Sequence, residues 1–174
     1  MSDPNPNTQP NGLDHEAAAQ GQAGVQVTVQ KIYVKDASFE APSSPHIFQE
    51  QAQPQIQLNL NQKVNPLAEG VFEAVLTVTI TCKIADKTAY LAEVHQAGIF
   101  TLNGVEATMQ HAVLGTFCPN TLFPYARQAI SDQILAGGFP PLFLQPINFE
   151  QLYVDQMRRR AAEAEAAQTT PPAA

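Results

Sequence analysis

The sequence contains no tryptophan and only two cysteines, Cys82 and Cys118, which lie far apart. Two distant cysteines provide neither a disulfide framework nor the paired short spacing of a structural zinc site. The four histidines likewise lack the close spacing that is typical of metal ligands. We therefore expect no bound metal and no other cofactor.

Positive charge is also scarce. The chain has nine lysines and arginines against sixteen aspartates and glutamates, and a formal net charge of -7. Three of the nine basic residues, Arg158, Arg159 and Arg160, stand together, and we expect this triplet to be solvated. Because no basic face precedes position 158, nucleic acid is not an expected partner. A basic protein surface would suit this acidic chain better.

Long apolar runs are absent as well. No stretch approaches the roughly 20 consecutive apolar residues that a membrane span needs. The first residues show neither the basic nor the apolar region of a signal peptide. We therefore expect a cytoplasmic protein that does not insert into the membrane, and the low cysteine content suits a reducing compartment.

Composition divides the 174 residues into three parts. Residues 1–24 are rich in proline, asparagine, glutamine, glycine and alanine, so they bury too little apolar area to order and are interpreted as a disordered tail. Residues 25–157 contain most of the large apolar side chains and are expected to form one domain. Residues 158–174 end in an alanine-rich stretch with Pro-Pro and are interpreted as a mobile tail.

The first half of the domain alternates with the period of β-strands. In "VQVTVQKIYV" the apolar residues change parity between Val29 and Ile32, which predicts a bulged strand. "QIQLNLN" predicts a half-buried strand with an uncharged amide face. "VFEAVLTVTITCKI" and "TAYLAEVHQAGIFTL" predict an antiparallel hairpin with Asp86 and Lys87 at its turn. These four strands predict one antiparallel sheet.

The second half changes to helical spacing. A short helix is expected from about position 105 until the Cys118-Pro119 step breaks it, and a second from about 121 to 136, capped by Asn120. "NFEQLYVDQMRRR" predicts a final amphipathic helix. Strands first and helices last predict an α+β fold, with a four-stranded antiparallel sheet and helices packed on one side.

Two arrangements could support catalysis. Cys118 could act as a nucleophile with His111 on the preceding helix, or it could pack as a small apolar residue at the proline break. Glu93 and His95 fall on one face of a strand, where they could form an acid–base pair or simply a solvated surface. The sequence shows no third group to orient Cys118 and His111.

Large apolar residues are concentrated in proline-interrupted stretches, above all in "FPPLFLQPINF". Such residues can form ordinary core beneath loops. They can also line a groove or a subunit interface that leaves apolar surface available to partners.

Four stretches together resemble one family: "IYVKDASFEAPSSPHIFQ", "AYLAEVHQAGIF", "CPNTLFPYAR" and "GGFPPLFLQPINF". They are similar, in order and spacing, to SecB, the bacterial protein-export chaperone family. The resemblance implies a homotetramer built as a dimer of dimers, without catalytic activity. It also implies an ATP-independent holdase that binds unfolded precursor proteins and delivers them to the SecA translocation ATPase.

The resemblance also implies two sets of site residues. The SecA-binding face of the family matches Asp36, Glu40, Leu91 and Glu93 here. Its acidic character suits the basic, zinc-bearing tail that SecA uses in this family, and the zinc belongs to the partner. The client groove matches the positions Ile47, Phe48, Phe149, Leu152 and Tyr153.

One position departs from the family pattern. Many members carry a tryptophan shortly after the "HIFQ" string, where this chain has Ala52, so the groove is expected to be shallower there. Two alternatives to the export chaperone remain open at this point. One is a chaperone of the same fold dedicated to another partner system, and the other is a small cysteine-dependent or Glu/His-dependent enzyme.

Overall fold

The structure, a computed structural model, describes residues 26–169, with side chains up to residue 164. The predicted tail at 1–24 and the last residues, 170–174, lie outside the described part. The elements follow in the order β1 (Gln26–Glu40), a 3-10 helix η1 (His46–Gln49), β2 (Gln55–Ala68), β3 (Val71–Ile84), β4 (Lys87–Asn103), α1 (Ala107–Ala136) and α2 (Phe149–Thr169).

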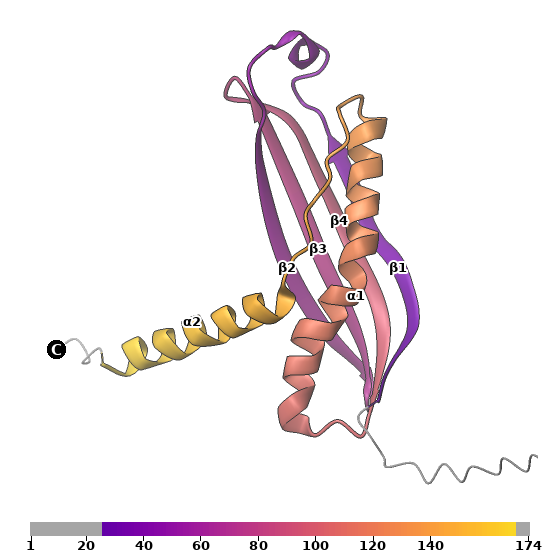
Figure 1. Ribbon diagram of the computed structural model, residues 1–174, viewed down its shortest axis with the longest axis vertical. Helices are drawn as coiled ribbons and strands as arrows, with labels where there is room; N and C mark the ends of the chain where they lie inside the picture. The colour runs from indigo at the N-terminus through magenta and orange to yellow at the C-terminus, as the bar shows by residue number, and fades with distance from the viewer. Residues whose placement is uncertain (1–25, 170–174) are drawn as a thin grey trace, which may run out of the picture.

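The four strands form one antiparallel sheet in the order β1-β4-β3-β2, which confirms the predicted sheet (Figure 1). The β3–β4 hairpin closes through Ala85 and Asp86, both at positive φ, 48° and 62°. Two central residues at positive φ give the turn a twist that matches the twist of the flanking strands. The turn therefore lies one residue earlier than predicted, because Lys87 pairs with Ile84 as the first residue of β4.

The predicted bulge in β1 is confirmed, and the strand has a second one. Its register against β4 shifts between Val29 and Lys31 and again between Val34 and Asp36. At the second bulge Lys35 is the extra residue. The buried side-chain amide of Gln96 donates a hydrogen bond of 2.9 Å to the Tyr33 carbonyl at this point.

Helix α1 packs on one face of the sheet, chiefly on β3 and β4 (Figure 1). The strand residues facing it form the continuous apolar row that the sequence predicts, Ala74, Leu76, Val78, Ile80 and Cys82. We call this the helix face of the sheet. The opposite face, which carries Thr77 and Thr79 of β3, is called the outer face.

Residues 107–136 form one helix, so the predicted break at Cys118-Pro119 and the cap at Asn120 are wrong. Pro119 removes one backbone hydrogen bond and normally kinks or ends a helix. Here apolar residues on both sides of it, among them Leu114 and Leu122, are buried in the same core. Burial of these apolar residues along one side of the helix outweighs the cost of the lost hydrogen bond. Figure 1 shows α1 as one bent helix.

The final helix is confirmed but is longer than predicted. α2 extends to Thr169 and includes the exposed Arg158–Arg160 triplet, so the backbone of 158–169 is helical. Of the two helices only α1 covers the sheet, because α2 packs mainly against α1. Figure 1 shows α2 projecting away from the body of the domain. No helix among residues 26–169 is long and apolar enough to cross a membrane.

Candidate functional site

The register of β1 on β4 brings the acidic candidates together. Glu40 lies opposite Leu91, and Asp36 lies opposite His95. Glu93 stands between them on β4, and all of these positions belong to the outer face. Because residues two apart on a strand share a face, the four predicted partner-binding residues form one surface on neighbouring strands. We call Asp36, Glu40, Leu91 and Glu93 the acidic face.

Glu93 is the most constrained carboxylate of the acidic face. Thr79 donates a hydrogen bond of 2.6 Å to its Oε2, and His95 Nε2 lies 2.9 Å from its Oε1. These hydrogen bonds, that of Thr79 first, lower the pKa of Glu93. Asp36 and Glu40 are exposed. The acidic face therefore combines one carboxylate that hydrogen bonds hold in place with two that are exposed.

The structure brings Glu93 and His95 together, with no third side chain of the described part of the chain shown to orient His95, and the Cys118 alternative finds no support in the geometry. Cys118 is 0% exposed, and burial raises the pKa of its thiol to about 12, so it is neither accessible nor ionised. His111 contacts Tyr153 of α2, whose hydroxyl lies 3.1 Å from its Nδ1. Among the described side chains, those of residues 26–164, no group of three His, Cys, Asp or Glu could hold a metal ion. Cys118 packs as an apolar core residue.

A second polar group on the outer face was missed from the sequence. Glu73 of β3 is 7% exposed, and Lys35 Nζ lies 2.8 Å from both of its carboxylate oxygens. Tyr33 donates a short hydrogen bond to Oε1, and Asn65 Nδ2 donates one of 2.9 Å to Oε2. These hydrogen bonds, that of Lys35 first, lower the pKa of Glu73 to about 2. We call the four residues the Glu73 cluster.

The sequence held one signal for the Glu73 cluster. Glu73 is the only charged residue within the otherwise uncharged run from Val71 to Cys82, on the strand face that carries threonines. A buried acid in such a run requires a cationic partner. Nothing in the sequence says that this partner comes from β1, because the strand order that brings β1 and β3 within reach is a tertiary property.

The predicted client-groove residues separate into two groups. Ile47 and Phe149 are 2% and 6% exposed and belong to the hydrophobic core. Phe48 is 52% exposed, with its ring centroid 5.0 Å from that of Phe139, and Leu152 is 46% exposed. Tyr153 is half-buried between α2 and α1. Phe48 and Leu152 are thus accessible at the surface, whereas Ile47 and Phe149 belong to the core beneath them.

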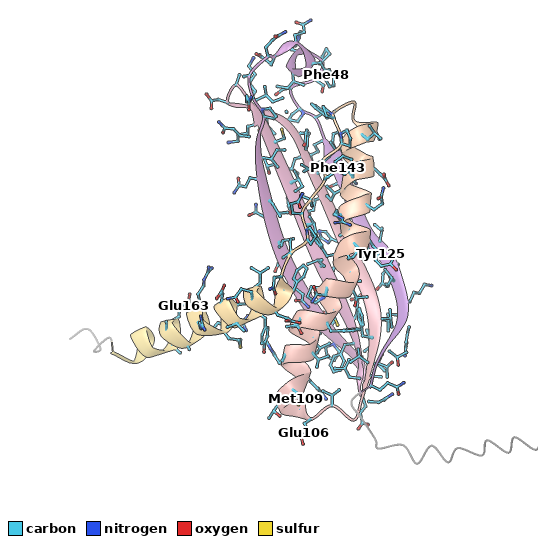
Figure 2. The ribbon with its side chains drawn as sticks, viewed as in Figure 1. Phe48, Glu106, Met109, Tyr125, Phe143 and Glu163 are labelled. Carbon is cyan, nitrogen blue, oxygen red and sulfur yellow. The ribbon has the colours of Figure 1, made fainter. Side chains whose placement is uncertain are left out.

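Several other apolar residues are exposed on the helix side, and three of them, which were not among the predicted groove residues, lie on β2 and on the segment between the helices. Ile56 and Leu58 of β2 are 46% and 38% exposed and pair with Cys82 and Ile80 of the core row. α1 lies chiefly over β3 and β4, so it leaves β2 partly uncovered. Phe143 is 75% exposed on the segment between the helices (Figure 2). Together with Phe48 and Leu152 these residues are called the apolar band.

Period-two alternation could have identified Phe143. In "LFL", Leu142 and Leu144 pack against the core, and Phe143 between them points away from it. Both interpretations of the proline-rich stretch, core beneath a loop and exposed apolar surface, therefore apply to part of it. Phe139, Leu142, Leu144, Ile147 and Phe149 are core beneath the loop, and Phe143 is exposed apolar surface.

Exposed apolar side chains on one side of a sheet and a group of acidic side chains on the other are typical of a protein that binds other polypeptide chains. Comparison with known proteins defines the class further. The family model "Preprotein translocase subunit SecB" matches residues 19–160. The chain therefore belongs to the SecB family of protein-export chaperones, which is not a family of enzymes.

Curated relatives agree over most of their length. The Protein-export protein SecB of Stenotrophomonas maltophilia is 58% identical over 143 residues, which cover 82% of this chain and 83% of that protein. The protein of the same name from Xanthomonas euvesicatoria is 53% identical over 157 residues, 90% of this chain and 92% of that one.

A solved structure shares the fold. The Mycobacterium tuberculosis Rv1957 SecB-like chaperone, in complex with a ChAD peptide from the Rv1956 HigA1 antitoxin, superposes with a TM-score of 0.59. It is 16% identical, and the match covers 70% of this chain and 90% of that one. At this identity the match supports the α+β fold alone.

Proposed function

We propose that this export chaperone is an ATP-independent holdase of the cytoplasm that binds unfolded precursor proteins and delivers them to SecA. The observation that carries the proposal is the separation of two surfaces. The acidic face lies on the outer face of the sheet, and the exposed Ile56 and Leu58 of the apolar band lie on the helix face. A client and a motor protein can then be bound at the same time.

The apolar band suits an unfolded client. An unfolded chain offers scattered large apolar side chains, so its binder needs apolar contact surface and tolerance of sequence. Phe48 of η1 and Phe143 of the segment between the helices provide exposed rings (Figure 2). Burying one aromatic side chain against a client contributes about 1.5–3 kcal/mol in transfer terms. Several weak contacts along one chain would add to a useful affinity.

The acidic face suits the basic tail of SecA. A single exposed ion pair contributes only about 0.2–1 kcal/mol and is screened by salt. Several copies must therefore act together, and a homotetramer, a dimer of dimers as in the family, would supply them. The expected affinity for SecA then falls steeply as ionic strength rises.

A second candidate is a chaperone of the same fold that is dedicated to another partner. The structural neighbour binds an antitoxin peptide, and its fold is shared here. A dedicated chaperone would recognise one peptide and would not need the acidic face. Removing the charges of the acidic face distinguishes the two proposals: it should abolish SecA binding by an export chaperone and should have no effect on a dedicated chaperone.

The holdase is tested by diluting a urea-unfolded secretory precursor into the protein without nucleotide, while refolding and complex mass are followed. Stoichiometric arrest in a tetramer-sized complex, with the native precursor ignored, would support the proposal. Unhindered refolding would contradict it and favour a dedicated partner.

The docking face is tested in parallel with purified SecA. The double variant Asp36→Asn/Glu40→Gln should lose most of its affinity for SecA and still arrest the precursor. The control Glu106→Gln/Asp132→Asn makes the same change in charge at exposed positions of the α1 segment. Equal losses in both variants would mean that only net charge matters, and the specific docking face would be rejected.

A further inference from the structure

The Glu73 cluster connects strands that are not neighbours. Tyr33 and Lys35 belong to β1 and Glu73 belongs to β3, and β4 lies between them in the sheet. The crossing runs diagonally over β4, because Tyr33 lies opposite Ala97 and Glu73 lies opposite Ile99, and Ala97 is 0% exposed. The small side chain of Ala97 leaves room for the long side chains of Tyr33 and Lys35 to pass over the strand. The cluster therefore holds β1 from across the sheet.

The residue that Glu73 holds is the extra residue of the second β1 bulge. Lys35 has no partner on β4, while Val34 pairs with Gln96 and Asp36 pairs with His95. In a regular strand successive side chains alternate between faces. Because of the bulge, Lys35 and Asp36 both point to the outer face.

The bulge decides which side chains reach the acidic face. Without the extra residue, Lys35 would pair with His95, and Asp36 would take the place of Ala37 opposite Val94, a core residue. A one-residue shift sends every later side chain to the other face. Asp36 and Glu40 would then leave the acidic face.

Two contacts hold the bulge from opposite faces of the sheet. On the helix face the Gln96 amide donates to the Tyr33 carbonyl, 2.9 Å away. On the outer face Lys35 and Tyr33 bind the same carboxylate of Glu73. A bulge interrupts the regular ladder of hydrogen bonds, so such side-chain contacts set its geometry.

We infer that Glu73 is a positioning residue for partner docking: by holding Lys35 and Tyr33, it fixes the β1 bulge that turns Asp36 and Glu40 toward the partner. This inference rests on the proposed docking function of the acidic face. Glu73 itself is nearly buried and need not contact the partner.

The sharpest test uses Lys35→Met, because charge and positioning predict opposite results. Lys35 is a cation beside the acidic face, so its removal should strengthen binding of the basic SecA tail if only charge matters. Positioning predicts a loss of affinity of about three- to tenfold instead. Glu73→Gln should show a loss of similar size, and the double variant should lose no more than either single one.

The control is Glu69→Gln, which removes the same charge from an exposed residue of the β2–β3 turn. Each variant is assayed as the full chain for SecA affinity, arrest of an unfolded precursor, and amide hydrogen exchange. We expect faster exchange of the amides at positions 35–38 in Lys35→Met and Glu73→Gln alone, with precursor arrest unchanged in all three variants.

The outcomes are distinct. Tighter binding by Lys35→Met, or equal losses in Glu73→Gln and Glu69→Gln, would show a charge effect and overturn the inference. Unchanged binding and exchange in Glu73→Gln would overturn it too, while loss in Asp36→Asn/Glu40→Gln would leave the proposed function intact. Normal SecA binding by Asp36→Asn/Glu40→Gln would instead reject the docking face, and Glu73 would then have no docking residues to position.

Discussion

Gly115 of α1 lies directly against the ring of Tyr153 of α2. A methyl group at position 115 would lie 2.6 Å from Cδ2 and 2.8 Å from Cε2 of that ring. Both distances are shorter than van der Waals contact, so the absence of a side chain at Gly115 allows this approach of the two helices. The hydroxyl of Tyr153 also lies 3.1 Å from His111 Nδ1, one turn earlier on α1.

Gly115→Ala should therefore destabilise the packing of α2. In a helix interior this change alone stabilises by about 0.5–1 kcal/mol, whereas forcing a methyl group into a packed contact costs about 1–3 kcal/mol. We expect a net loss of stability in chemical denaturation and faster proteolysis of α2. In a Tyr153→Ala background the same change should become stabilising, and destabilisation there as well would contradict the contact.

Phe48 and Ile47 are neighbours in sequence with different expected roles. Phe48→Ala removes a ring that is 52% exposed, so precursor arrest should weaken with little change in stability. Ile47→Ala empties a core site that is 2% exposed and should cost about 2–5 kcal/mol of unfolding free energy. Urea denaturation and the refolding assay separate the two effects. Equal losses of stability would refute the assignment of Phe48 to the client surface.

The two thiols should be inert in the native protein. Cys82 and Cys118 are 2% and 0% exposed, and burial raises the pKa of both. A colorimetric thiol reagent at pH 8 should react only after denaturation, and then with both thiols. Cys118→Ser should leave precursor arrest intact while lowering stability, because it buries a hydroxyl. Rapid labelling of the native chain would reopen the nucleophile hypothesis.

Glu73 should contribute to the acid dependence of stability. Its folded pKa is lowered from 4.5 to about 2, so the stabilisation is complete above pH 4.5 and is lost as the pH falls toward 2. Glu73→Gln removes this titration. The difference in unfolding free energy between the wild type and Glu73→Gln should therefore shrink from pH 5 to pH 2. A constant difference across that range would mean that the cluster does not depress this pKa.

Sequence periodicity was sufficient to predict the four strands. The alternating apolar rows of β3 and the parity change in β1 predict the sheet and one bulge, because these patterns follow from which side of a strand is buried. The helix boundary at Pro119 was wrong for the opposite reason. The local rule for proline is correct in isolation, but the burial of Leu114 and Leu122 on one core outweighs it.

Resemblance to the SecB family supplied the residues of the acidic face, and the register of β1 on β4 explains why they form one surface. It could not separate Ile47 from Phe48. That distinction depends on which side of η1 meets the core, and only the packed structure shows it.

The sequence by itself determined the fold class, the acidic character and the family of this protein, because these follow from local patterning, composition and long matching motifs. The tertiary structure alone decided the strand order β1-β4-β3-β2, the continuity of α1 and the Glu73 cluster. The physical reason is that each of these depends on contacts between residues far apart in the chain, whose free energy no local pattern contains.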